Sequence, residues 1–148
     1  MNNEPDLQTR EDLINIYNSR GFTELIERIL ILQKNYPKSL FLLNLLGSTN
    51  NELENYNEAI INFERIIKIN SKFSDAYYNL GIIYKKNNQI DKSIDNYYKC
   101  LKINPKKYEA YNNLGNIFKD KYEIESAVEN YLYCLEINSD YKIALQNF

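Results

Sequence analysis

The sequence predicts an all-α protein in which consecutive helix pairs stack into a solenoid. Its strongest indication is the stretch from Ser74 to Lys107, which recurs on both sides at an interval of about 34 residues. The same residues return at the same places, so that Asn79-Leu80-Gly81 comes back as Asn113-Leu114-Gly115. An interval of this length is that of a helix-turn-helix unit, which buries its apolar face only against its neighbours.

The helices can be placed one after another along the chain. Polar residues 1–6 are expected to form a disordered leader. Thr23 is a candidate N-cap of the second helix, and Pro37 falls where the closing proline of a repeat would stand. The helices are expected over Leu7 to Ser19, Thr23 to Tyr36, Leu40 to Glu52, Asn57 to Ile69, Asp75 to Lys86, Ile90 to Ile103, Glu109 to Lys121 and Ile124 to Ile137.

These helices group into repeats of unequal regularity. Residues 7–39 form a divergent N-terminal pair, since they lack Leu-Gly and carry Leu25 where the repeat has a small residue. Three fuller repeats follow, over 40–73, 74–107 and 108–141. Residues 142–148 begin a further first helix, which is either truncated or a cap.

Glycine recurs in the middle of three first helices, at Gly47, Gly81 and Gly115. A mid-helix glycine costs about 1 kcal/mol of helix propensity against alanine. Three recurrences of a costly residue imply a steric cause. We therefore expect the two helices of each repeat to approach closely at these glycines.

The recurring residues resemble the tetratricopeptide repeat, a family of right-handed α-helical superhelices. The central copy matches at eight positions and the next copy at seven. The matching residues are Tyr77, Leu80, Gly81, Tyr84, Ser93, Tyr97, Cys100 and Pro105, and then Tyr111, Leu114, Gly115, Phe118, Ala127, Tyr131 and Cys134. The resemblance implies a protein-interaction module whose first helices line a concave groove.

Asparagine dominates the stripe of first-helix residues expected to face that groove. Asn79, Asn113 and Asn147 recur once per repeat, and a carboxamide can pair with both the N–H and the C=O of an extended peptide. This asparagine ladder resembles the one in O-linked N-acetylglucosamine transferases. The equally weighted alternative is that these asparagines have no binding role. They would then only reflect the abundance of asparagine in this chain, at positions exposed to solvent. The candidate peptide-binding residues are Asn44, Tyr78, Asn79, Lys85, Asn112, Asn113, Asn116, Lys119 and Asn147.

A second use of such repeats is a clamp for carboxylate-ended chaperone tails, built from lysine and asparagine. At the corresponding places only Asn79 fits, and Glu109 would repel a carboxylate. The sequence therefore argues against this role.

Composition excludes several other classes of function. A net charge of −2 gives no general attraction to nucleic acid or anionic lipid, and the tyrosines occupy packing positions of the repeat. With no histidine, and with Cys100 and Cys134 one repeat apart, neither a metal site, a cofactor nor a catalytic constellation is expected. The two cysteines are expected to be core fillers. No apolar run is long enough to span a membrane and no signal peptide is evident, so a cytoplasmic protein is expected.

Two further roles remain open beside a stand-alone interaction module. The spacing from Leu13 to Leu46 is similar to the start of bacterial proteins that join such repeats to a glycosyltransferase or sulfotransferase domain. The chain would then present substrate to a larger enzyme. Alternatively, copies could self-associate through an end face bearing Ala144, Leu145 and Phe148.

Overall fold

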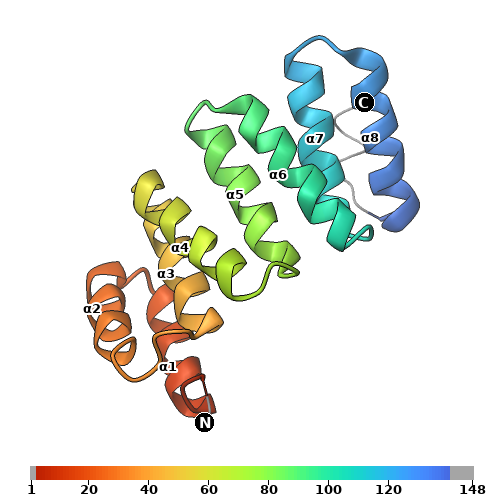
Figure 1. Cartoon of the computed structure of the whole chain (residues 1–148). Coiled ribbons are helices and arrows are strands. Elements are labelled where there is room, and N and C mark those ends of the chain that lie inside the picture. Colours follow the sequence, from red (N-terminus) through yellow and green to blue (C-terminus); the bar gives the residue numbers. More distant parts are fainter. Residues whose placement is uncertain (1–2, 141–148) are drawn as a thin grey trace. The chain divides into compact units, whose positions relative to one another are not determined.

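Eight α-helices follow one another along residues 3–140, the part of the chain that this computed structural model describes (Figure 1). No β-strand occurs among these residues, and the all-α prediction is confirmed. The helices are α1 Leu7–Asn18, α2 Phe22–Leu32, α3 Leu40–Glu52, α4 Tyr56–Ile69, α5 Ser74–Lys86, α6 Ile90–Ile103, α7 Tyr108–Asp120 and α8 Ile124–Ile137. The chain divides into two compact units, Met1–Ser71 and Lys72–Phe148, which we describe separately.

The four odd-numbered helices are the first members of pairs, here called A helices, and the even-numbered ones are B helices. Each A helix is followed, two positions after its last residue, by a residue with left-handed backbone, and the four residues are spaced by the repeat length. Their φ angles are 62° at Arg20, 59° at Glu54, 55° at Asn88 and 62° at Tyr122. The next N–H then donates to a carbonyl five residues back, as from Gln89 to Tyr84 at 2.8 Å, which satisfies the helix end. The first pair makes this same turn although it lacks Leu-Gly.

The mid-helix glycines lie against aromatic rings of the paired B helix. A Cβ atom built on Gly81 would come within 2.6 Å of the Tyr97 ring, and one on Gly115 within 2.5 Å of the Tyr131 ring. Real Cβ atoms do not approach so closely, because protein interiors are already packed like crystals. Gly47 meets Phe63 in the same way. The expected close contact of the two helices is therefore confirmed.

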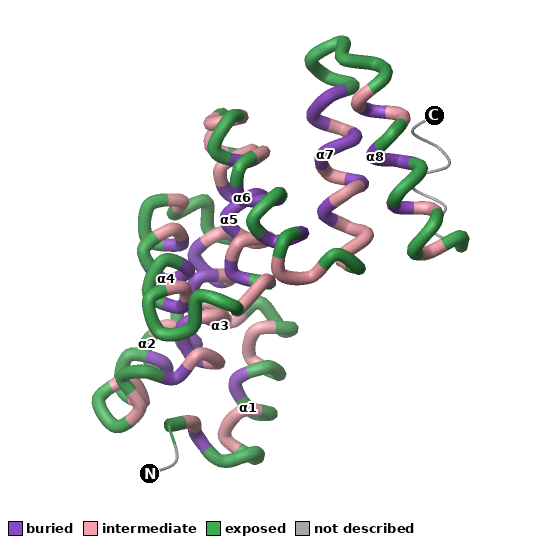
Figure 2. The backbone as a smooth tube through the Cα atoms, turned by 45° about the vertical axis from the view of Figure 1, so that its right-hand side comes forward, coloured by how far each residue is buried: buried purple, intermediate pink, exposed green. Residues whose placement is uncertain are grey.

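The core of the second unit is aromatic and lies between its helix pairs. It is built from Tyr97, Leu101, Ala110, Leu114, Ile117, Phe118, Ala127 and Tyr131, and Figure 2 shows such buried positions recurring along α7. Ser93 takes the small position of α6, where its hydroxyl donates to the Gly81 carbonyl at 2.7 Å. Cys100 and Cys134 are free thiols buried in the B helices, so their expected role as core fillers is confirmed.

One core cluster of the first unit is aliphatic and is built from Leu13, Leu25, Ile29, Leu42, Leu45 and Leu46. Leu13 is buried and holds the place that glycine holds in the three later A helices. A cavity of about 280 Å³ opens between α1 and α2, lined by Thr9, Asp12, Leu13, Arg28, Ile31 and Leu32.

The N-terminal residues differ from the expected disordered leader from residue 4 onward. The Glu4 carboxylate accepts from the Leu40 N–H at 2.9 Å and from the Ser39 hydroxyl. Ser39 in turn caps α3, since its Oγ accepts from the Leu42 N–H at 3.0 Å. Pro5 is buried, and Asp6 caps α1. The N-terminus of α3 is thus capped in part by Glu4, a residue more than thirty positions earlier in the sequence.

The second helix was misplaced at both ends. It begins at Phe22 after Gly21, so Thr23 lies inside α2 and is not its N-cap. It ends at Leu32 rather than Tyr36. Pro37 disfavours helical backbone in Tyr36, the residue before it. Residues 33–35 form a turn, and the Tyr36 N–H that follows donates to the Leu32 carbonyl at 2.9 Å.

Candidate binding surface

The A helices of the second unit share a polar surface, which we call the α5–α7 surface. It consists of Asp75, Tyr78, Asn79, Ile82, Lys85 and Lys86 of α5, of Lys107 at the start of α7, and of Glu109, Asn113, Asn116, Lys119 and Asp120 of α7. Three sets of interactions connect α5 and α6 with α7 and with Lys107 just before it, one at each end of the surface and one in the middle. They fix side chains that the sequence assigned to peptide binding.

Asn113 makes the middle interaction. Its Nδ2 donates to the Tyr97 hydroxyl at 3.2 Å and to the Tyr78 hydroxyl at 3.4 Å. Burial raises the pKa of the Tyr97 hydroxyl, which therefore stays protonated. The donors of this carboxamide are thus directed at tyrosines of the preceding repeat. Its oxygen is the atom suited to meet a peptide N–H.

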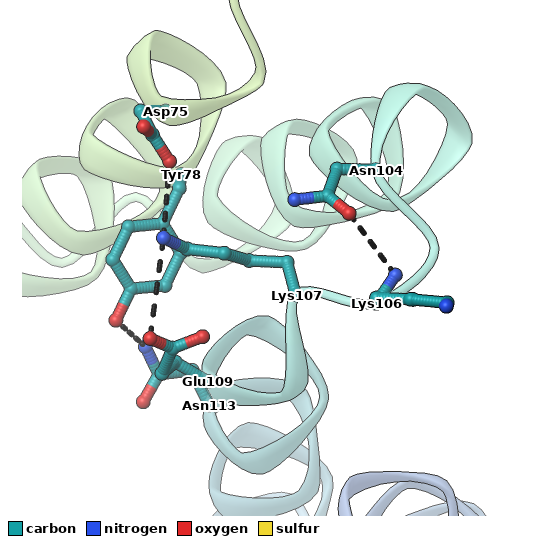
Figure 3. A network of polar contacts seen from close by, with 7 residues as sticks. All are labelled: Asp75, Tyr78, Asn104, Lys106, Lys107, Glu109 and Asn113. Atoms are coloured by element: carbon teal, nitrogen blue, oxygen red, sulfur yellow. Dashed lines mark hydrogen bonds and ion pairs between the residues drawn. The ribbon is translucent and has the colours of Figure 1, made fainter. Parts of the chain in front are cut away.

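Lys107 makes the interaction at the N-terminal ends of α5 and α7. Its ammonium donates to Asp75 Oδ1 at 3.0 Å, lies 4.0 Å from Glu109 Oε1, and sits 4.8 Å from the centre of the Tyr78 ring (Figure 3). Burial by itself would lower the pKa of Lys107, but the hydrogen bond and the charges of Asp75 and Glu109 outweigh it and raise the pKa. The lysine side chain is only 21% exposed, whereas that of Asp75 is 54% exposed.

Lys85 makes the third interaction, at the C-terminal ends of the same helices. Its Nζ lies 3.6 Å from Asp120 Oδ2. Lys86 and Lys119 are exposed beside it along the two helices. Basic groups therefore gather at this end of the surface, opposite the carboxylates of Asp75 and Glu109.

The ladder residues Asn79 and Asn113 are both half-buried on this surface, and Asn147 lies outside the described residues. Asn116 accepts from the Tyr131 hydroxyl at 2.8 Å. Asn44 is half-buried in the first unit, on α3. Several candidate side chains are therefore already held by tyrosine hydroxyls or carboxylates of their own unit.

Asn112 was wrongly assigned to the surface. It is only 4% exposed. At 3.6 residues per turn it points about 100° away from Asn113, whereas Glu109, Asn116 and Asp120 cluster around Asn113. Tyr78, one repeat earlier, occupies the same place but reaches Asn113 because its side chain is longer.

Sequence reasoning missed Lys107. The equivalent places in the earlier repeats hold Ser39 and Phe73, so no recurrence pointed to a lysine there. It also missed a second series of asparagines, on the B helices. Asn62, Asn96 and Asn130 are buried, and each donates to the carbonyl four residues back at 2.7 to 2.8 Å. Their spacing by the repeat length was the signal that could have found them.

The two thiols are poorly suited to chemistry, because burial raises the pKa of both Cys100 and Cys134 to about 11 and so makes them weak nucleophiles. Within residues 3–140 no group of three or more carboxylate or thiol side chains is arranged to hold a metal ion. None of the helices described is long and apolar enough to cross a membrane.

Comparison with protein families identifies the repeats. Models described as tetratricopeptide repeat match residues 74–107 and 108–141, and one described as TPR repeat matches residues 47–88. The chain is a tetratricopeptide-repeat protein. No curated protein matches it.

Solved tetratricopeptide-repeat structures share the fold. A crystal structure of MamA is 26% identical, with a TM-score of 0.79, and the match covers 90% of this chain and 80% of that one. MamA from Desulfovibrio magneticus RS-1 is 19% identical, with a TM-score of 0.79 and coverages of 89% and 75%. YrrB, a TPR protein with an unusual peptide-binding site, is 18% identical, with a TM-score of 0.77 and coverages of 88% and 68%. The latter two similarities concern the fold alone.

Proposed function

We propose that this tetratricopeptide-repeat protein is an interaction module that holds an extended peptide or partner segment on its α5–α7 surface. The observation that carries the proposal is the cross-repeat array of polar side chains, fixed in place by the Lys107, Asn113 and Lys85 interactions. Side chains that are already ordered lose little further entropy when a ligand binds. The peptide-binding site of YrrB is a fold-level analogy to this proposal.

The asparagine ladder is part of the proposal in a revised form. Asn113 would accept from a peptide N–H through its oxygen, because its donors face Tyr78 and Tyr97. Asn79 would act one repeat earlier on α5. Asn44, Asn116, Lys85 and Lys119 would contact the flanks of the bound segment.

The test is peptide affinity after removal of the ladder. Peptides would first be selected against the whole chain from a displayed library. The double variant Asn79→Ala and Asn113→Ala is expected to weaken their binding at least tenfold, since two hydrogen bonds of roughly 1 kcal/mol each would be lost. Unchanged affinity would refute the ladder.

Two controls separate binding from stability. Asn15→Ala with Asn57→Ala removes two exposed asparagines of the first unit and should leave affinity unchanged. Tyr97→Phe removes the hydroxyl that Asn113 holds and keeps the carboxamide. If Tyr97→Phe abolished binding as fully as the ladder variant does, the loss would come from the lost positioning of the Asn113 side chain and not from a lost hydrogen bond between Asn113 and the peptide.

Presentation of substrate to a larger transferase is a second proposal, favoured only by the spacing from Leu13 to Leu46. An adjoining reading frame that encodes a transferase domain would support it. Self-association through Ala144, Leu145 and Phe148 is a third. Those residues lie outside the described part of the chain, and a mass independent of concentration in sedimentation would refute it.

A further inference from the structure

Charge is divided between the two ends of the α5–α7 surface. At the N-terminal ends of the helices, Asp75 and Glu109 share the single ammonium of Lys107, so this group carries a net charge of about −1 at neutral pH. Lys106 is adjacent in sequence, but its side chain points away from the group (Figure 3). The lysine is largely covered while Asp75 is half exposed, so the group presents carboxylate to solvent.

The opposite end carries the opposite sign. Lys85, Lys86 and Lys119 lie there beside the carboxylate of Asp120, which pairs with Lys85, so ammonium groups outnumber this carboxylate. Asp75 and Lys86 are eleven positions apart on one helix, or about 16 Å at 1.5 Å per residue. An extended peptide covers this distance with about five residues.

The interaction of charged side chains with helix ends could explain each charged residue by itself. It does not explain why charges of one sign from two helices gather at each end of the surface. Acids at an N-terminus and bases at a C-terminus stabilise any helix. Here, however, residues of two repeats combine, and the ammonium of Lys107 already lies on the Tyr78 ring between two carboxylates. Lys107 occupies this face of the ring, but the half-exposed carboxylate of Asp75 can still pair with a further cationic side chain.

We infer that the α5–α7 surface selects a segment with a basic residue at the Asp75–Glu109 end and an acidic residue at the Lys85–Lys86–Lys119 end, about five residues apart. This inference rests on the proposed function and adds the charge pattern of the ligand to it. The occupant is a mixed-charge extended peptide. Segments carrying only acidic or only basic residues meet a like charge at one end and bind more weakly.

Five capped hexapeptides test the inference against the whole chain. They share the central residues Ser-Thr-Val-Ser and carry Lys and Glu, Glu and Lys, Lys and Lys, Glu and Glu, or Gln and Gln at the first and sixth positions. NMR titration at low salt measures each Kd. At least one of the two mixed-charge peptides is expected to bind five times more tightly than the Gln peptide and each like-charge peptide.

A charge-removing variant provides a positive readout. Asp75→Asn with Glu109→Gln leaves Lys107 without its counter-charges, so both ends of the surface become basic. The preference is then expected to change to the peptide with Glu at both ends, and a variant that merely unfolds cannot show such a gain. Asp95→Asn with Glu129→Gln removes two exposed carboxylates of the B helices and should leave the original preference unchanged.

The outcomes separate this inference from the proposed function. Equal affinity of all five peptides, or failure of every mixed-charge peptide to bind, would overturn the charge selection. The proposed function is judged independently, because display-selected peptides that require Asn79 and Asn113 would still support it. A preference that persists unchanged at 0.5 M salt, where exposed charges are screened beyond about 4 Å, would also contradict the inference.

Discussion

At the scale of single residues, packing against the mid-helix glycines sets the distance between paired helices. A Cβ on Gly81 would stand 2.6 to 2.8 Å from three atoms of the Tyr97 ring, which is itself fully buried. The ring cannot withdraw without disturbing its neighbours, because it packs in the core with Leu101, Ala110 and Leu114. Alanine gains helix propensity at this position but overpacks the contact.

Gly81→Ala is therefore expected to destabilise the protein by up to about 2 kcal/mol, since overpacking costs about 1–3 kcal/mol and the gain in helix propensity offsets about 1 kcal/mol of that cost. Urea unfolding followed by circular dichroism measures the change. Lys86→Ala, on the exposed end of the same helix, should change stability by less than about 0.5 kcal/mol. A Gly81→Ala protein more stable than the wild type would show that the ring yields easily.

At the scale of elements, the turn between paired helices is repeated more faithfully than the sequence. Arg20, Glu54, Asn88 and Tyr122 all adopt left-handed backbone, although only asparagine favours it among these four. The helix-ending hydrogen bonds impose the conformation on the other three. A glycine at these positions would adopt it without the Cβ penalty.

Tyr122→Gly is expected to stabilise the protein by roughly 0.5–1 kcal/mol, because relief of the left-handed strain exceeds the entropy that glycine loses. Tyr122 as a whole residue is 89% exposed, so little packing is lost. Asn88→Gly is the matched control and should gain less, since asparagine already tolerates this backbone. Thermal unfolding midpoints compare the two, and an equal or larger gain at Asn88 would contradict the account.

The start of α3 depends on a residue far away in sequence. Glu4→Ala removes the acceptor of the Leu40 N–H and of the Ser39 hydroxyl. We expect a loss of about 1 kcal/mol, the usual value of a helix cap. Glu11→Ala, at an exposed position of α1, serves as control. Hydrogen exchange should show faster opening at Leu40 in the Glu4 variant only, and equal exchange in both would mean that Glu4 does not cap α3.

At the scale of the whole molecule, the buried neutral groups predict sensitivity to alkali. Burial raises the pKa of Cys100 and Cys134 to about 11, and burial likewise raises that of Tyr97. A raised folded-state pKa gives stability that is fully present below the unfolded value, about 9 for a thiol. That stability is lost as pH rises toward 11.

The free energy of unfolding is thus expected to fall by on the order of a few kcal/mol between pH 9 and pH 11. Urea titrations at a series of pH values measure it. The double variant Cys100→Ala and Cys134→Ala should show a shallower fall, whatever its stability at pH 7. An identical slope in the two proteins would mean that the thiols are not the groups responsible.

Much of the fold could be predicted because it depends on residues that recur. The helix pairs, the glycine contacts and the role of the cysteines follow from the repeat. The surface was harder to predict because its contacts use positions that differ between repeats. Lys107 stands where Ser39 and Phe73 stand earlier. Tyr97, whose hydroxyl accepts from Asn113, stands where Phe63 stands one repeat earlier. Asn112 was misassigned because a repeated stripe does not show where the surface of a helix ends.

The central claim is that a bound peptide lies on the α5–α7 surface, and mapping its contacts tests this most directly. A display-selected peptide would be titrated into isotope-labelled protein while the side-chain amides of Asn79, Asn113 and Asn116 are followed by NMR. The account predicts that these amides shift first and most strongly, while those of Asn62 and Asn96 on the B helices stay unchanged. Shifts confined to the B helices, or to the cavity between α1 and α2, would contradict it.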